Sequence, residues 1–110
     1  MSEDGRKNER IAGYLGIAQR AGKIAAGDEA VLKNLSSPQV FMVIVATDAA
    51  TDVKKKILDV ISKSKYNKQI TCIQWNTKIA LGHMVGKSQR GALAVLDEGF
   101  AKAIKKLMDE

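Results

Sequence analysis

The segment from Leu81 to Ser88, LGHMVGKS, carries glycines, a lysine and a hydroxyl in an order close to that of a phosphate-binding loop. Such a loop requires Gly, four residues and then Gly-Lys-Ser or Gly-Lys-Thr after a strand, so that backbone N–H groups surround the phosphates. Here three residues separate Gly82 from Gly86, and the preceding segment has helical spacing. The segment therefore does not predict a nucleotide site.

Nucleophilic catalysis would have to use Cys72 and His83, the only cysteine and the only histidine of the sequence. A thiol nucleophile needs a base within hydrogen-bond reach. The pattern places Cys72 in an apolar strand and His83 on a helix, where such residues usually have structural or solvated positions. A small hydrolase stays an alternative only if a deep pocket joins the two side chains. We therefore expect that the protein is not an enzyme and has no catalytic residue.

Metal and cofactor sites are not expected either. One cysteine cannot form a disulfide or a cysteine cluster within the chain, and one histidine cannot form a histidine-based zinc cluster. The adjacent acids Asp28-Glu29 and Asp97-Glu98 stand at expected helix starts, where carboxylates cap a helix and complement its dipole. We therefore predict no metal and no cofactor.

The charge balance is basic, with eighteen Lys and Arg against twelve Asp and Glu and a formal net charge of +6. This excess favours a polyanionic partner such as nucleic acid. Residues 54–68 contain six lysines and one acid, Asp59, and this run is either a solvated outer face or a binding surface. A second set stands beside glycine-bounded turns, where backbone can approach a phosphate closely. It comprises Lys23, Lys33, Lys87 and Arg90.

The elements that must position these residues alternate between helical and strand spacing. Strands alternating with helices predict an α/β fold, a three-layer α-β-α sandwich around a mixed, about four-stranded sheet. Expected strands are Lys23–Ala26, Val40–Thr47, Ile70–Trp75 and 91–97. Expected helices are Asn8–Gln19, one opened by Gly27-Asp28-Glu29, one capped by Thr51 or Asp52, one capped by Thr77 and running to about Val85, and a last one with Phe100, Ala103, Ile104, Leu107 and Met108 on one stripe.

Length and hydropathy point to one compact unit. At 110 residues with 45% hydrophobic content, the chain can build one core, so we predict a single domain over residues 1–110. The longest apolar stretch, residues 40–46, is too short to span a bilayer, and no secretory signal is readable at the N-terminus. We expect a cytoplasmic monomer without membrane contact.

Four stretches carry a family resemblance: AGKIAAGDEAVLK at 21–33, VIVATDA at 43–49, LGHMVGK at 81–87 and LDEGFA at 96–101. Their order and spacing resemble the small kink-turn-binding ribosomal proteins of the large subunit, the L-seven-Ae / L-thirty-e superfamily, and most closely its bacterial YlxQ-type branch. The resemblance covers nearly the whole chain. It implies an α-β-α sandwich that binds structured or ribosomal RNA, or the ribosome, through a helix start and a neighbouring loop.

In RNA-binding relatives the first site reads Gly, one residue, Asn-Glu, two residues and Lys. This chain reads GDEAVLK, so that Gly27 and Lys33 match. Glu29 stands at the Asn position and Ala30 at the Glu position, unless the register slips by one and gives these roles to Asp28 and Glu29. A carboxylate can accept hydrogen bonds from guanine N1 and N2, which keeps part of the role.

The resemblance implies a second site in the loop after the helix at 77–85. In relatives this loop packs near bases extruded from the kink. Here Lys87 and Arg90 would hold the RNA backbone, and Ser88 or Gln89 would bond an exposed base. We expect the two sites to lie side by side and to form one electropositive edge. The predicted RNA-binding residues are Lys23, Gly27, Asp28, Glu29, Lys33, Val85 as apolar support, Gly86, Lys87, Ser88, Gln89 and Arg90.

One alternative to RNA binding stays open at this point. Members of a fold family can differ in function, and the altered Asn-Glu pair at Glu29 and Ala30 could mark a protein-interaction module that has lost RNA binding. A titration with kink-turn RNA and with a straight duplex separates the two interpretations.

Overall fold

The computed structural model describes residues 3–110, and within them the chain forms five α-helices, four strands and one short 3-10 helix. In chain order these are α1 Glu3–Arg20, β1 Ile24–Ala26, α2 Asp28–Asn34, β2 Met42–Val45, α3 Thr51–Lys63, η1 Asn67–Gln69, β3 Thr71–Gln74, α4 Lys78–Met84, β4 Ala92–Val95 and α5 Glu98–Met108.

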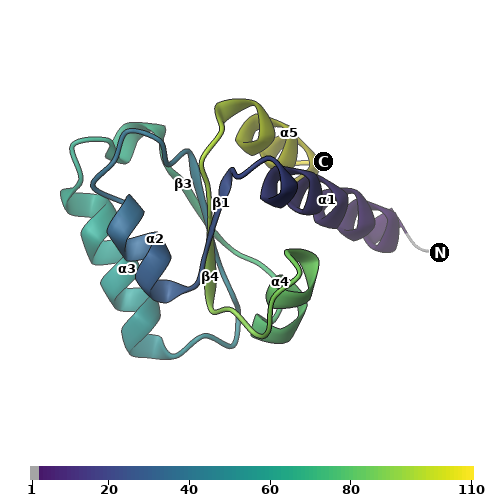
Figure 1. Cartoon of the computed structure of the whole chain (residues 1–110), viewed down its shortest axis with the longest axis horizontal. Helices are drawn as coiled ribbons and strands as arrows, with labels where there is room; N and C mark the ends of the chain where they lie inside the picture. The colour runs from purple at the N-terminus through teal and green to yellow at the C-terminus, as the bar shows by residue number, and fades with distance from the viewer. Residues whose placement is uncertain (1–2) are drawn as a thin grey trace.

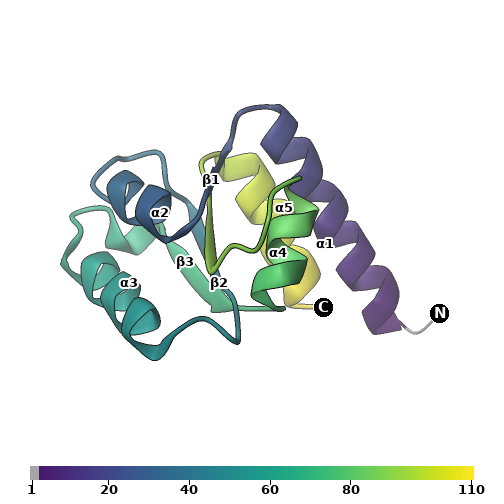
Figure 2. The ribbon, with the colours of Figure 1, turned by 60° about the horizontal axis from the view of Figure 1, so that its bottom comes forward.

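The elements stack in three layers (Figure 1). The sheet is the middle layer, α2 and α3 cover one of its faces, and α1, α4 and α5 cover the other. The view in Figure 2 shows the same division, and within the second helical layer α1 packs against both α4 and α5. The predicted α-β-α sandwich around a mixed sheet of about four strands is confirmed.

The sheet has the strand order β1-β4-β2-β3. Strands β1 and β2 each pair antiparallel with β4, and β3 pairs parallel with β2. In this register Val43 lies opposite Ala94 on one side and Cys72 on the other. Every residue of the central strands β2 and β4 is buried, as expected for strands that helices cover on both faces.

The helical stripes that the spacing predicts face the sheet. Ile11, Leu15 and Ala18 of α1 are fully buried, and Ile57 and Ile61 of α3 are buried between that helix and the strands. Side chains spaced by three and four residues lie on one face of a helix, so each stripe packs into one continuous core. Among the helices of residues 3–110, none combines the length and the apolar character that crossing a membrane requires.

Helix ends agree with the sequence in part. Thr77 caps α4 by accepting a hydrogen bond from the Ala80 N–H, and the Asp97 carboxylate accepts one from the Phe100 N–H of α5. The cap predicted for α3 is wrong, because Ala50 is the capping residue and makes no side-chain hydrogen bond. The preceding backbone turns one residue earlier than the Thr51 and Asp52 side chains suggest, which places both in the first turn of the helix.

The first helix begins earlier than its apolar spacing indicates. The prediction started at Asn8, whereas α1 extends from Glu3. Residues 3–10 contain no apolar side chain, so the hydrophobic pattern carries no signal for these turns.

Candidate functional site

Two segments that are distant in the sequence meet at one end of the sheet. A Cβ atom built on Gly27 would lie 3.4 Å from Cδ of Arg90 and 3.7 Å from its Nε. A Cβ atom built on Gly91 would lie 2.7 Å from Oδ1 of Asp28. The start of α2 and the loop between α4 and β4 are therefore in direct contact. We call the surface formed by Gly27, Asp28, Glu29, Lys33 and residues 86–90 the rim.

The antiparallel pairing of β1 with β4 creates this juxtaposition. Ala26 lies opposite Leu93, and the next residue, Gly27, donates its N–H to the Ala92 carbonyl at 2.8 Å. The chain then leaves β1 directly into α2, while the loop after α4 leads into β4 at the same place (Figure 1). The predicted side-by-side position of the two segments is thus present.

Gly27 is the N-cap of α2 and has φ 106° and ψ 158°, a conformation that side chains rarely allow. The Val31 N–H is bonded to the Gly27 carbonyl at 2.9 Å, so the N–H groups of residues 28–30 have no acceptor inside the helix. Within residues 3–110, no side-chain hydrogen bond caps this helix start. The start of α2 therefore presents backbone donors beside the carboxylates of Asp28 and Glu29.

The second segment turns sharply at the end of α4. The Gly86 N–H donates to the His83 carbonyl at 3.1 Å, and the Lys87 N–H donates to the Gly82 carbonyl at 2.8 Å. This pair of bonds is the Schellman arrangement that closes many helices. It directs the next residues back across the helix, and residues 86–89 are exposed.

Arg90 holds the loop in shape. Its N–H donates to the Lys78 carbonyl at 3.0 Å. Its Nη1 donates to the Ser88 hydroxyl at 2.8 Å, to the Gln89 carbonyl at 3.0 Å and to the Ser88 carbonyl at 3.3 Å. The guanidinium therefore folds over its own loop and lies against Gly27, with its other nitrogens in no hydrogen bond that the described residues supply.

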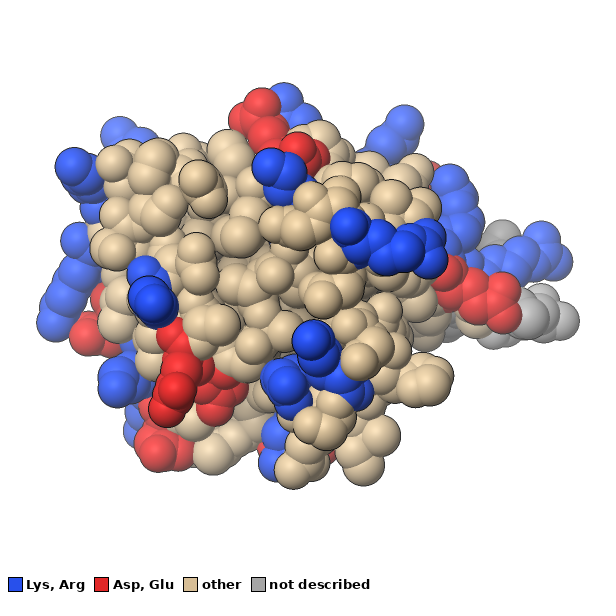
Figure 3. All heavy atoms as spheres, in the orientation of Figure 1, with Lys and Arg blue, Asp and Glu red and all other residues tan. Residues whose placement is uncertain are grey.

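Charges of both signs meet on the rim. On the face shown in Figure 3, an acidic patch lies where α2 begins in Figure 1, and basic side chains lie beside it over α2 and over the loop before β4. Glu29, Lys33 and Lys87 are exposed. Oδ1 of Asp28 is buried and has no hydrogen-bond partner among residues 3–110. A carboxylate oxygen without a donor is a costly arrangement, and an incoming donor would relieve it if the loop gave access.

Two predicted site residues are not on the rim. Lys23 lies at the opposite end of β1 from Gly27, where its carbonyl accepts from the Leu96 N–H. Val85 is 3% exposed and packs in the core, so its side chain can support the loop only from beneath. The remaining predicted residues lie on the two segments that meet, where Gly27 and Asp28 contact the loop directly and Lys33 follows in the last turn of α2.

Sequence reasoning missed two glycines that shape the rim. Gly82 is buried in α4, and a Cβ atom on it would lie 1.9 Å from the Ser88 carbonyl oxygen. Gly91 leaves room for the Asp28 carboxylate. A glycine inside a helical pattern lowers helix stability, so its presence at position 82 could have indicated that another segment packs closely there.

Cys72 and His83 do not form a site together. Cys72 lines a hollow of about 190 Å³ with Lys54, Leu58 and Gln74, on the side of the sheet that α3 covers. His83 is exposed on α4, in the opposite layer. Desolvation raises the pKa of the Cys72 thiol, which makes the thiolate scarcer rather than more available. The hydrolase alternative therefore lacks the shared pocket that it requires.

The comparisons with known proteins agree with this architecture. A model of the family described as ribosomal protein L7Ae/L30e/S12e/Gadd45 matches residues 9–105. The chain is 31% identical over 109 residues to the RNA-binding protein YlxQ of Enterococcus faecium, with 99% of each chain covered. It is 33% identical over 95 residues to the RNA-binding protein YlxQ of Bacillus subtilis strain 168, which covers 86% of this chain and 91% of the relative.

Solved structures show the same fold. A protein with unknown function from Bacillus halodurans C is similar with a TM-score of 0.81 at 35% identity, over 91% of this chain and 97% of that chain. The Giardia lamblia 15.5kD RNA binding protein has a TM-score of 0.70 at 15% identity, over 94% of this chain and 86% of its own, which shows a shared fold. The predicted kinship with the superfamily and its YlxQ-type branch is confirmed, and the chain belongs to the ribosomal protein L7Ae/L30e/S12e/Gadd45 family.

Proposed function

We propose that this chain is a monomeric, cytoplasmic RNA-binding protein that recognises kink-turn-like RNA at the rim, free or in the ribosome, without catalysis. The observation that carries the proposal is the contact between Gly27 and Arg90, which joins a helix start and a basic loop into one surface. The names of two relatives that match over most of the chain, both RNA-binding proteins, support it.

The rim offers donors suited to an RNA backbone. Lys33 and Lys87 are exposed, Arg90 has further guanidinium nitrogens beside Nη1, and the first N–H groups of α2 have no acceptor inside the helix. Ammonium, guanidinium and helix-start N–H groups are the usual partners of phosphate oxygens. Phosphate contacts at the rim would fix the position of the RNA without reading its sequence.

The acids on the rim favour folded RNA over a plain duplex. Asp28 and Glu29 repel phosphates, but their carboxylates can accept from the N–H groups of a base edge. Base edges of a regular A-form duplex are poorly accessible, whereas a kinked internal loop presents unstacked bases. Ser88 and Gln89 are exposed on the adjacent loop and can bond to a base as well.

The test compares two RNAs of equal length and charge. We expect a fluorescently labelled kink-turn RNA to bind at least about tenfold more tightly than a straight duplex at the same salt concentration. The RNA should be recovered at its original length after long incubation, since no cleavage is proposed. Weak and equal binding of both RNAs would instead favour a protein-interaction module of the same fold.

A further inference from the structure

A groove lies between the C-terminal ends of α2 and α3, at the other end of α2 from Gly27. Its volume is about 480 Å³, within the range of sites that hold a ligand or the side chains of a partner. Its apolar walls are Leu32 and Leu35 from the α2 side and Val60 and Tyr66 from the α3 side. We call this hollow the α2–α3 groove.

Hydrogen bonds hold the walls of the groove in place. The Ser64 hydroxyl donates to the Leu35 carbonyl at 3.2 Å and accepts from the Tyr66 N–H at 3.1 Å. This one side chain thus connects the end of α2 to the segment after α3. A groove with connected walls is preformed, so that a ligand does not have to order them on binding.

The border of the groove is positively charged. The residues that line the groove include two lysines and no acidic residue. Lys63 and Lys65 line the groove themselves, and the Lys65 ammonium lies 5.3 Å from the centre of the Tyr66 ring. An apolar floor with a cationic border complements a ligand that has an apolar stripe flanked by carboxylates.

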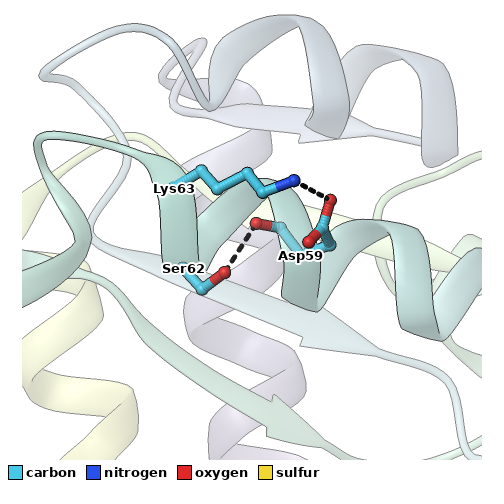
Figure 4. A network of polar contacts seen from close by, with 3 residues as sticks. All are labelled: Asp59, Ser62 and Lys63. Atoms are coloured by element: carbon cyan, nitrogen blue, oxygen red, sulfur yellow. Dashed lines mark hydrogen bonds and ion pairs between the residues drawn. The ribbon is translucent and has the colours of Figure 1, made fainter.

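The nearest acid on α3 is already paired. Asp59 accepts from the Lys63 ammonium at 3.2 Å along the helix, while the Ser62 hydroxyl donates to the Asp59 backbone carbonyl (Figure 4). Both side chains of this ion pair are more than half exposed, so the pair is weak and exchangeable. A carboxylate of a partner can take the place of Asp59.

We propose that the α2–α3 groove docks an acidic amphipathic helix of a partner protein, with one or two aliphatic side chains against Leu32, Val60 and Tyr66, above the fully buried Leu35, and with carboxylates at Lys63 and Lys65. The groove would give the chain a protein-binding surface in addition to the rim, and it does not depend on RNA binding.

The wall chemistry favours a peptide over RNA as the occupant. Three of the four apolar walls are branched aliphatic side chains, which offer a base neither a stacking plane nor a hydrogen-bond partner. The one aromatic wall, Tyr66, is half-buried and already lies under the Lys65 ammonium. Aliphatic walls of this kind seat the leucines of an amphipathic helix instead.

The experiment uses the full chain and a synthetic peptide with leucine at i, i+3, i+4 and i+7 and glutamate elsewhere. We expect saturable changes in amide NMR shifts that are concentrated at Leu32, Val60 and Tyr66. A peptide with lysine for every glutamate should not bind. Absence of saturable shifts, or equal binding of the lysine peptide, would overturn the proposal.

Charge variants test the border of the groove. Lys63→Glu and Lys65→Glu should each weaken glutamate-peptide binding about three- to tenfold, and Asp59→Asn should strengthen it about twofold. Lys102→Glu is the matched control, because Lys102 is 76% exposed and paired with Glu98 at i,i+4 just as Lys63 is 75% exposed and paired with Asp59. An equal loss in Lys102→Glu would show a general charge effect and reject the site.

A final NMR titration with kink-turn RNA tests the groove separately from the proposed function of the rim. We expect the RNA to leave the signals of Val60 and Tyr66 unmoved and Arg90→Ala to leave peptide binding unchanged. Failure of RNA binding with intact peptide binding would reject only the rim. If RNA moved the amide signals of Val60 and Tyr66 and also prevented the peptide from binding, the groove would be an RNA surface, and the peptide proposal would be overturned.

Discussion

Gly82 lies so close beneath Ser88 that a Cβ atom on the glycine would come within 1.9 Å of the serine carbonyl oxygen. The loop that carries half of the rim therefore rests directly on the backbone of α4. The Lys87 N–H also donates a hydrogen bond to the Gly82 carbonyl, which holds the start of the loop against the same residue. The shape of the loop thus depends on a residue that has no side chain to bind a ligand.

Gly82→Ala should destabilise the protein although alanine is the better helix former. The added methyl would meet backbone atoms of the loop, and overpacking of this kind costs about 1–3 kcal/mol. Thermal or urea unfolding measures the change. Gly13→Ala is the control, since Gly13 is a helical glycine in α1 with no atom within 4 Å of the new Cβ, and it should stabilise by about 0.5–1 kcal/mol. A stable Gly82→Ala protein would contradict the packing described.

Lys33→Ala should weaken kink-turn binding and reduce its salt dependence. Lys33 is exposed on α2, and a lysine that contacts one phosphate contributes about one counterion to the salt slope. Binding isotherms at several salt concentrations give both quantities. Lys106→Ala, an exposed lysine on α5 in the opposite layer, should leave the slope unchanged. Unaltered affinity and an unaltered salt slope in Lys33→Ala would show that Lys33 does not contact the RNA.

The double substitution Glu29→Asn and Ala30→Glu should strengthen kink-turn binding about tenfold. It restores the Asn-Glu order of the RNA-binding pattern and leaves the net charge unchanged, so that any gain comes from hydrogen bonds to bases. Those bonds are specific to splayed bases, and binding of the straight duplex should not change. An equal gain for both RNAs would mean that the substitution acts through general attraction to phosphate.

Cys72 should react with iodoacetamide at a higher pH in the folded protein than in the unfolded chain. Desolvation raises the pKa of this thiol by favouring its neutral form, and only the thiolate reacts. The pH–rate profile of alkylation, measured with and without urea, gives the two midpoints. The folded midpoint should be the higher one. A lower folded midpoint would mean that a cation, such as the Lys54 ammonium of the same hollow, outweighs desolvation.

The sequence predicted the layers and most elements because these depend on spacing. A buried strand such as Met42–Val45 is recognised from its continuous apolar run. Caps such as Thr77 and Asp97 are recognised from a capping side chain just before a helical pattern. The early start of α1 carries no such signal, since residues 3–10 contain no apolar side chain. The cap of α3 was misplaced because a local residue preference was outweighed by the path of the loop that precedes the helix.

Of the geometry of the rim, the sequence predicted only that its two segments lie in contact. That Gly27 and Arg90 meet follows from the family pattern, but not from composition. Lys23 was misplaced relative to the other site residues because a short strand separates it from Gly27, and sequence proximity hides this separation. The burial of Val85 and the fit of Gly82 under Ser88 are tertiary facts that no local pattern contains.

The hydrogen bond from Gly27 to Ala92 continues the β1–β4 pairing one residue beyond the end of β1, so the gap between the two halves of the rim is set before any ligand arrives. A rigid receptor of this kind loses little conformational entropy on association. The ligand must then supply the conformational change, and we expect RNA sequences that bend at low cost to bind the most tightly.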